Sequence, residues 1–218
     1  MKTSSQNKIK NFWNWFQDNH QTIYNLQTET PKNRKHINFW MQKHLNYYST
    51  GISFIITFQK RPKKGATLII TANGNPAYFR VVTDLIDNAP VIKNWTFQAF
   101  IKPTEDLELV MDELDEPFII NDITIKASEA KFLPFNCDEK GDKFDILVFL
   151  KNYDIHCKTD NWTQAIYIIM QLLFGEKFIY QSINFVQLAQ ETDEETEALQ
   201  LCLLENYIDI FRSEYGEE

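Results

Sequence analysis

The chain has 218 residues and a formal net charge of −8, and 44% of its residues are hydrophobic and 14% aromatic. This composition excludes an intrinsically disordered chain, and no stretch approaches the roughly 18 consecutive apolar residues of a membrane helix. Because no apolar segment with a cleavage site follows the N-terminal basic residues, we expect a cytoplasmic protein that does not enter a membrane.

Charge is divided unevenly along the chain. Residues 1–102 contain 14 Lys or Arg and 4 Asp or Glu, a net charge of +10, whereas residues 103–218 contain 8 and 26, a net charge of −18. We interpret residues 1–218 as one compact unit with a basic sub-unit, 1–102, and an acidic sub-unit, 117–218, joined by the acidic strip 103–116. The overall isoelectric point of about 5.1 argues against nucleic-acid binding.

The first 50 residues predict two helices. Apolar residues recur at helical spacing from Ile9 to Ile23 and again from Ile37 to Tyr48. The polar residues around Pro31 predict the break between the two helices.

The next segments predict a β-β-α-β unit. Residues 52–58 and 66–72 are rich in β-branched and aromatic side chains and flank a connection with Pro and Gly, which predicts a hairpin. The Asn-Gly-Asn-Pro turn at 73–76 predicts an abrupt helix start, with an Asn N-cap and Pro in the first helical position. This helix should run to about Asn88, and residues 95–101 alternate as a third strand.

The same order of elements is predicted after the acidic strip. Strands are expected across residues 118–132, at 144–150 and at 178–188, with a helix capped by Asp160 before the last of them. The chain is therefore interpreted as two β-β-α-β units that form an internal pseudo-repeat.

A C-terminal helix completes the predicted fold. It should begin at the capping box 192–195 and carry Leu199, Cys202 and Ile210 on its apolar stripe. The predicted fold class is α+β, with two N-terminal helices, the two β-β-α-β units, one C-terminal helix and a mixed sheet.

Patterns for catalysis, metals and cofactors fall short of what each chemistry requires. His36 and His44 are eight residues apart, a spacing that does not suit a pair of metal ligands on a helix. His156 and Cys157 are adjacent, so on a strand they would point to opposite faces. The turn at 73–76 has one glycine, too few for a phosphate-binding loop. We predict no catalytic residue, no cofactor and no metal.

Cysteine and tryptophan side chains are predicted to be structural. An odd number of cysteines at wide spacing matches neither a disulfide framework nor a zinc knuckle, so each is expected to be a small, partly buried residue. Most tryptophans fall near predicted apolar stripes and are expected in the core. These residues are Cys137, Cys157 and Cys202, and Trp13, Trp40, Trp95 and Trp162.

The most distinctive segment is Glu105–Glu116, which has seven carboxylates in twelve positions, with Leu, Val and Met residues among them. Two interpretations remain open. One is a solvated linker or short amphipathic helix, and the other is a docking strip for a basic protein partner. In the second interpretation the partner-binding residues are Asp112, Glu113, Asp115 and Glu116.

One part of the chain resembles a group of uncharacterised bacterial proteins. The resemblance rests on Ile-Thr-Ala-Asn-Gly-Asn at 70–75, then a helix, then Ala89-Pro90, Trp95 and Phe97, and it extends to Leu-Leu-Phe-Gly-Glu at 172–176. It covers about half of the chain. Because the group has no established activity, the resemblance implies a compact bacterial domain, and Trp95 and the Asn-Gly turn as structural hallmarks.

Three functions follow as hypotheses. The first is a non-enzymatic protein–protein interaction domain, because no catalytic motif is present. A narrower form of it is an immunity protein that blocks a basic toxin, since an acidic protein suits that electrostatic pairing. The competing hypothesis is an enzyme or small-ligand binder with a site between the two β-β-α-β units. Self-association stays open in all three.

Overall fold

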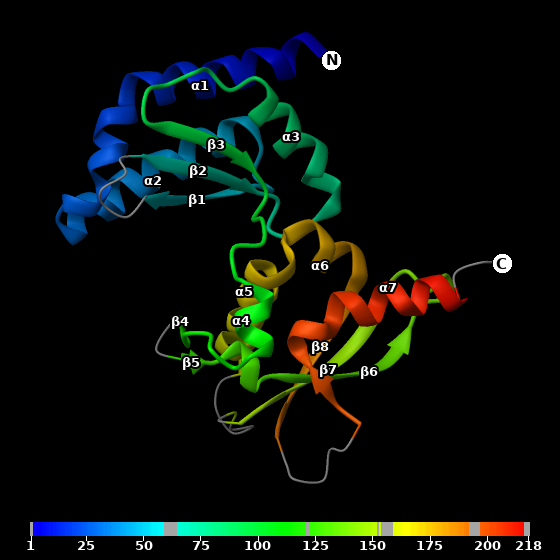
Figure 1. The fold of residues 1–218 in the computed structure, drawn as a ribbon. Coiled ribbons are helices and arrows are strands. Elements are labelled where there is room, and N and C mark those ends of the chain that lie inside the picture. The colour runs from blue at the N-terminus through cyan, green and yellow to red at the C-terminus, as the bar shows by residue number, and fades with distance from the viewer. Residues whose placement is uncertain are drawn as a thin grey trace. The chain divides into compact units, whose positions relative to one another are not determined.

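The computed structural model describes residues 2–58, 65–120, 123–151, 153, 159–191 and 197–215. The chain divides into two compact units, residues 1–101 and 102–218, and each buries its own hydrophobic core. The elements of both units are drawn in Figure 1. Residues 59–64, in the connection between the first two predicted strands, lie outside the described residues.

Two helices open the first unit, as predicted. They are α1 (Lys2–Tyr24) and α2 (Pro31–Tyr48), separated by a 3-10 turn, η1 (Asn25–Thr28). The start of α2 follows from its sequence, because Thr30 Oγ1 accepts a hydrogen bond from the Asn33 N–H and Pro31 occupies the first helical position.

The first unit also contains a three-stranded mixed sheet. Its strands pair in the order β1-β2-β3, with β1 antiparallel and β3 parallel to β2, so the predicted hairpin and the predicted mixed sheet are confirmed. The connection from β2 to β3 carries the predicted turn and helix. Asn75 caps the first, 3-10 turn of this helical segment by accepting a hydrogen bond from the Ala77 N–H. The elements are β1 (Ser53–Phe58), β2 (Ala66–Thr71), η2 (Pro76–Tyr78), α3 (Phe79–Asp87) and β3 (Trp95–Ala99).

Helix α1 packs on this sheet through an aromatic cluster. Phe16 makes edge-on contacts with Trp95 and Phe97 of β3, and Trp13 contacts Phe97 in the same way. Trp13 also donates a hydrogen bond from Nε1 to the carbonyl oxygen of Leu85, which ties α1 to α3. Trp13 and Trp95 are buried, as predicted.

The second unit is built on a four-stranded mixed sheet and a separate two-stranded hairpin. The larger sheet has the order β8-β7-β6-β9, in which only the β7–β8 pair is parallel, and β4 pairs with β5 antiparallel. The elements are α4 (Leu107–Met111), β4 (Phe118–Ile120), β5 (Ile123–Ile125), η3 (Ala127–Glu129), β6 (Lys131–Cys137), β7 (Phe144–Leu150), α5 (Thr159–Phe174), α6 (Glu176–Ser182), β8 (Ile183–Gln190), β9 (Leu199–Gln200), η4 (Leu201–Leu203) and α7 (Leu204–Tyr215).

Several boundaries in the second unit differ from the predictions. The predicted strand at 178–188 is wrong in its first half, because Gly175, at φ 87°, ends α5 and the chain continues as α6 before β8 begins. The predicted strand region 118–132 is the β4–β5 hairpin, a 3-10 turn and the start of β6. Helix α5 begins at Thr159, one residue before the predicted cap.

The C-terminal helix exists, but it starts later than predicted. The capping box at 192–195 lies outside the described residues. Leu199 belongs to β9, which pairs with β6, and Cys202 lies in a 3-10 turn, so the helix begins only at Leu204. Pairing with a strand edge outweighed the helical spacing of these apolar residues.

The acidic strip, predicted to join the two sub-units, is built into the second unit. Val110 on α4 is buried in the core of that unit. The N–H groups of Thr104 and Glu105 both donate to the carbonyl oxygen of Leu172 in α5. Asp106 caps α4 by accepting from the Glu108 N–H. The strip is therefore fixed by burial and backbone hydrogen bonds.

Candidate interaction surfaces

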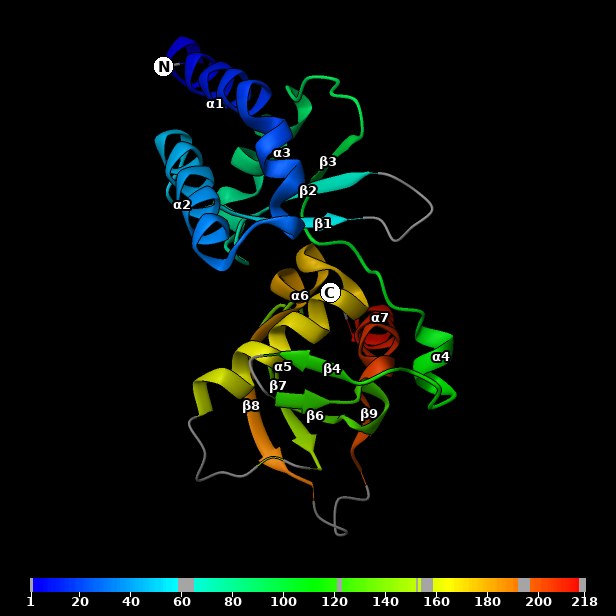
Figure 2. The ribbon, with the colours of Figure 1, turned by 90° about the vertical axis from the view of Figure 1, so that its left-hand side faces the viewer.

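Helices α1 and α2 lie side by side (Figure 2). Aromatic rings of the two helices contact one another along this pair. Trp15 of α1 stacks on His44 of α2, with ring centroids 4.1 Å apart and an interplanar angle of 8°. A hollow of about 390 Å³ lies on one side of this stack and a hollow of about 360 Å³ on the other. We call the two hollows and the stack between them the aromatic groove.

The rings of α2 are ordered by specific contacts. Trp40 donates from Nε1 to His36 Nε2 at 3.1 Å, and the Lys43 ammonium lies 4.5 Å from the centroid of the Trp40 ring. Three aromatic side chains of this helix are nevertheless exposed: Phe39 (59%), Trp40 (37%) and Tyr47 (59%). The prediction that Trp40 lies in the core is wrong, because the apolar stripe of α2 turns Met41 and Leu45 inward instead.

His44 is half-buried against Trp15, and His36 lies on the exposed side of α2. Burial, followed by the nearby Lys43 ammonium, lowers the pKa of His44 below its ordinary value of 6.5. The ring that stacks on Trp15 is therefore neutral at neutral pH.

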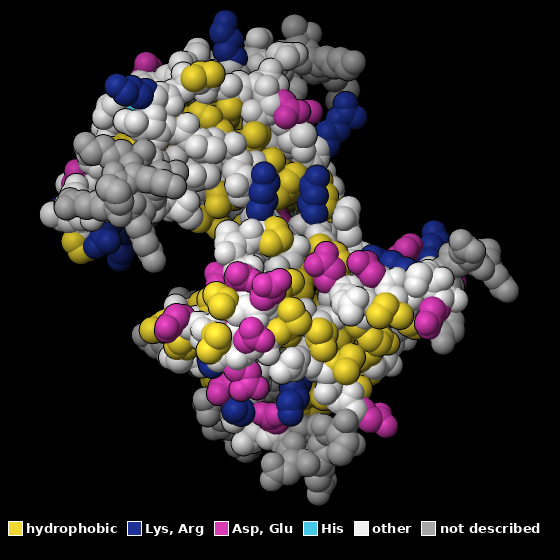
Figure 3. Space-filling model, viewed as in Figure 1, with side chains coloured by type: hydrophobic (Ala, Val, Ile, Leu, Met, Phe, Trp, Pro, Cys, Tyr) yellow, Lys and Arg dark blue, Asp and Glu magenta, His cyan; other side chains and the backbone are white. Residues whose placement is uncertain are grey.

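The acidic strip combines carboxylates with exposed apolar side chains. Asp112, Glu113 and Glu116 are exposed to solvent. Over the region of α4, acidic and hydrophobic side chains lie next to one another on the surface (Figure 3). The exposed apolar residues of the strip are Leu109 (46%), Met111 (44%) and Leu114 (68%).

Asp115 differs from the other three predicted partner-binding residues. Its side chain is only 5% exposed, and its Oδ2 accepts a hydrogen bond from the Ser128 N–H at 3.2 Å. The Lys126 ammonium lies 3.9 Å from Asp115 Oδ1 and donates to the Glu113 carbonyl oxygen at 2.7 Å. These contacts fasten the end of the strip to η3, so Asp115 positions the exposed carboxylates on either side of it.

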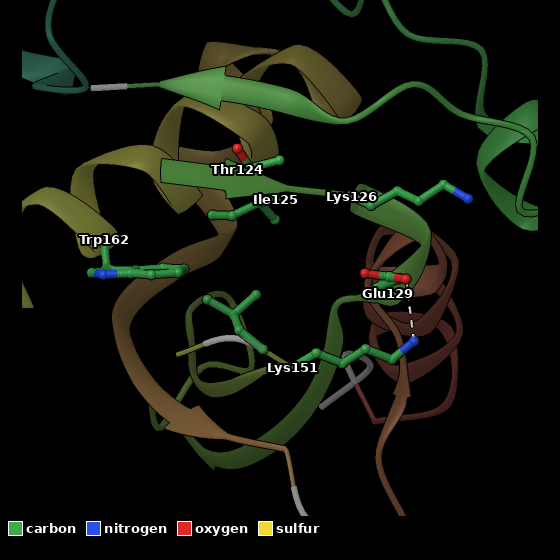
Figure 4. A pocket seen from close by; sticks show the side chains of 7 residues that line it. Thr124, Ile125, Lys126, Glu129, Lys151 and Trp162 are labelled. Atoms are coloured by element: carbon green, nitrogen blue, oxygen red, sulfur yellow. Dashed lines mark hydrogen bonds and ion pairs between the residues drawn. The ribbon is translucent and has the colours of Figure 1, made fainter. Parts of the chain in front are cut away.

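A smaller hollow in the second unit lies between β5, η3, the end of β7 and α5 (Figure 4). Its rim carries an ion pair between Lys151 Nζ and Glu129 Oε1 at 3.2 Å, and Trp162 closes one side. At about 20 Å³ it has room for about one water molecule, so it is not a substrate site.

The thiols within the described residues lack the features of nucleophiles. Cys202 is buried and Cys137 is half-buried. Burial is the main cause that raises the pKa of both thiols, and Asp138 raises the pKa of Cys137 further. Both therefore stay protonated at neutral pH. The pair His156–Cys157 lies outside the described residues.

Within the described ranges, no group of three His, Cys, Asp or Glu residues could hold a metal ion.

Comparison of the chain with protein-family models, with curated proteins and with solved structures returned no match. The resemblance to a group of bacterial proteins therefore stays a prediction. None of the helices in the described parts of the chain combines the length and the apolar character that a membrane crossing requires.

Proposed function

We propose that this is a cytoplasmic, non-enzymatic protein that binds a basic protein partner through the acidic strip. The observation that carries the proposal is that three exposed carboxylates and three exposed apolar side chains lie close together on one short segment that is anchored in its unit. We call this set the acidic-apolar surface: Leu109, Met111, Asp112, Glu113, Leu114 and Glu116.

Charge and apolar area have different roles on such a surface. Carboxylates that remain in water attract a basic partner over a distance and raise the association rate, but each contributes little to affinity. Leu114 and Met111 supply apolar area, and its removal from water favours a complex against the entropy that the two partners lose on association. A partner with basic residues around an apolar patch matches both features.

The strip is anchored by contacts within its own unit and needs no partner to make them. Val110 anchors α4 in the core, and Asp115 and Lys126 fix the chain just beyond the helix. A surface that is already in its bound conformation loses less conformational entropy on binding. This supports a binding role for the strip over the alternative of a solvated linker.

Affinity capture from the native cell extract would test the proposal. The test variant is Asp112→Asn, Glu113→Gln and Glu116→Gln combined, and the control is Glu139→Gln, Asp142→Asn and Asp209→Asn. The control removes the same charge from exposed positions of the same unit. We expect basic partners to be captured by the wild-type protein and by the control, and lost with the test variant. Equal capture by both variants would exclude the strip.

An immunity protein against a basic toxin is the narrower candidate. The net charge of −18 over residues 103–218 favours it, since the partner would then be strongly cationic. The gene for such a protein should adjoin a toxin gene, and co-expression should protect the host from that toxin. No adjoining toxin gene across several genomes would remove this candidate, whereas the broader proposal would stand or fall on the capture experiment.

We also infer that the two units contain an internal repeat. In each unit an antiparallel hairpin is followed by a helical connection and a strand parallel to the second hairpin strand, namely β1-β2-β3 and β6-β7-β8. An experimental structure in which these two sets of strands fail to superpose would refute the repeat.

A further inference from the structure

We propose that the aromatic groove of the first unit is a second binding site, and that its ligand is an acidic protein segment that inserts large apolar side chains. This inference rests on different residues from the acidic-apolar surface and requires a partner of the opposite charge. The two proposals therefore stand or fall separately.

The groove is formed by two facing stripes of residues. On α1, Asn11, Trp15 and Asn19 are four residues apart and so lie along one face of the helix. On α2, His36, Trp40 and His44 repeat the same spacing. The hollow with Asn11 also contains Tyr47, and the hollow with Asn19 also contains His36, so the helices run antiparallel and the hollows follow one another along the groove.

Size and lining suit side chains of a protein ligand. Both hollows fall in the range of about 300 to 1,000 Å³ that is typical of ligand sites. The larger hollow is lined by Ile23, Ile37 and Trp40, with Asn19 and Thr22 as polar groups at its margin. Mainly apolar walls with a few polar groups favour an aromatic or large aliphatic anchor, and exposed Trp and Tyr are enriched among residues that dominate binding energy.

Cations outnumber anions around the groove, so its charge favours an acidic ligand. Helix α2 carries Lys32, Arg34, Lys35 and Lys43 and has neither Asp nor Glu. Lys8 of α1 lines the smaller hollow. Carboxylates of a bound segment would meet cations along α2 and at one end of the groove.

Ring contacts favour a protein segment over single-stranded nucleic acid. Proteins bind single-stranded nucleic acid by letting its bases stack on free faces of aromatic side chains. Here one face of Trp15 is covered by His44, and the Lys43 ammonium lies over Trp40. The rings therefore act as walls of the hollows, and the space beside them receives side chains.

Selection from a phage-displayed random-peptide library on the full-length protein would test this proposal. We expect recovered peptides to have a net negative charge and one or more Phe, Tyr, Trp or Leu residues. Binding of the recovered peptides, measured by fluorescence polarisation, should weaken at least about tenfold in Trp40→Ala, because loss of a central aromatic anchor commonly costs more than about 1.4 kcal/mol.

Two further variants separate the site from general effects. Thr22→Trp places a large side chain at an exposed position that lines the larger hollow, so it should block binding while all native rings remain. Val91→Ala changes a fully exposed apolar residue of the same unit and should leave binding unchanged. Circular dichroism and the thermal midpoint would confirm that each variant is folded.

Several results would overturn the proposal. These are a library that yields no peptides, peptides that are neutral or basic, and binding that survives both Trp40→Ala and Thr22→Trp. A single-stranded oligo-dT that binds more tightly than every acidic peptide, and loses binding in Trp40→Ala, would assign the groove to nucleic acid instead. The triple variant of the acidic strip should leave peptide binding unchanged, so a failed capture experiment does not decide this one.

Discussion

The two units use the same arrangement of three strands but differ in the elements added to it. In the first unit two long helices precede the strands and leave an aromatic groove between them. In the second unit the short helix α4 and the acidic segment after it precede the strands, and α7 follows them. Residues 1–102 carry a net charge of +10 and residues 103–218 a net charge of −18. Both proposed binding surfaces thus lie on the added elements, and the shared strands supply the support.

The largest expected effect comes from emptying one core at a time. Phe16 and Phe132 are both fully buried, the first against Trp95 and Phe97 and the second against Tyr207. Phe16→Ala or Phe132→Ala should each reduce the free energy of unfolding by about 3 to 5 kcal/mol, because a large cavity remains.

Hydrogen exchange would show where each of these losses falls. We expect faster exchange within residues 1–101 for Phe16→Ala and within residues 102–218 for Phe132→Ala. If either variant raised exchange equally in both ranges, the two cores would not be independent of one another.

A smaller effect should distinguish two glycines. A Cβ on Gly51 would lie 2.1 to 2.4 Å from ring atoms of Tyr78, so Gly51→Ala forces the ring to move and should cost about 1 to 3 kcal/mol. Gly141 has space, with the nearest atom on Phe211 3.7 Å away, but its φ of +72° strains an L-residue. Gly141→Ala should cost about 1 kcal/mol. Urea denaturation would measure both, and a neutral Gly51→Ala would refute the close approach.

The smallest effect is a dependence of stability on pH in the first unit. Because the pKa of His44 is lowered in the folded protein, the unfolded chain binds a proton more readily, and stability falls as the pH drops through the ordinary value of 6.5. His44→Gln should remove part of this decline. Urea denaturation at a series of pH values from about 8 to about 5, followed by tryptophan fluorescence, would compare the slopes, and identical slopes would contradict the prediction.

Much of the fold could be predicted from local patterns. The hairpin, the Asn-Gly turn and the strand 144–150 were predictable because alternating β-branched residues and turn residues with positive φ act over a few positions. The wrong predictions concern segments in which contacts with residues distant in sequence override the local spacing of apolar residues. Leu199 is at helical spacing from Cys202, yet it pairs with Phe132 of β6 as part of a strand.

The candidate sites likewise combine features that the sequence shows with features that only packing sets. By itself the sequence determined the charge of each half, the run of carboxylates at Glu105–Glu116 and the absence of recognised catalytic motifs, because these are properties of composition and order. Only the tertiary structure decided that the side chain of Asp115 is buried while its neighbours are exposed, and that Trp40 lies outside the core. Both depend on which face of a helix or turn meets the rest of its unit, and that choice is made by packing across many residues.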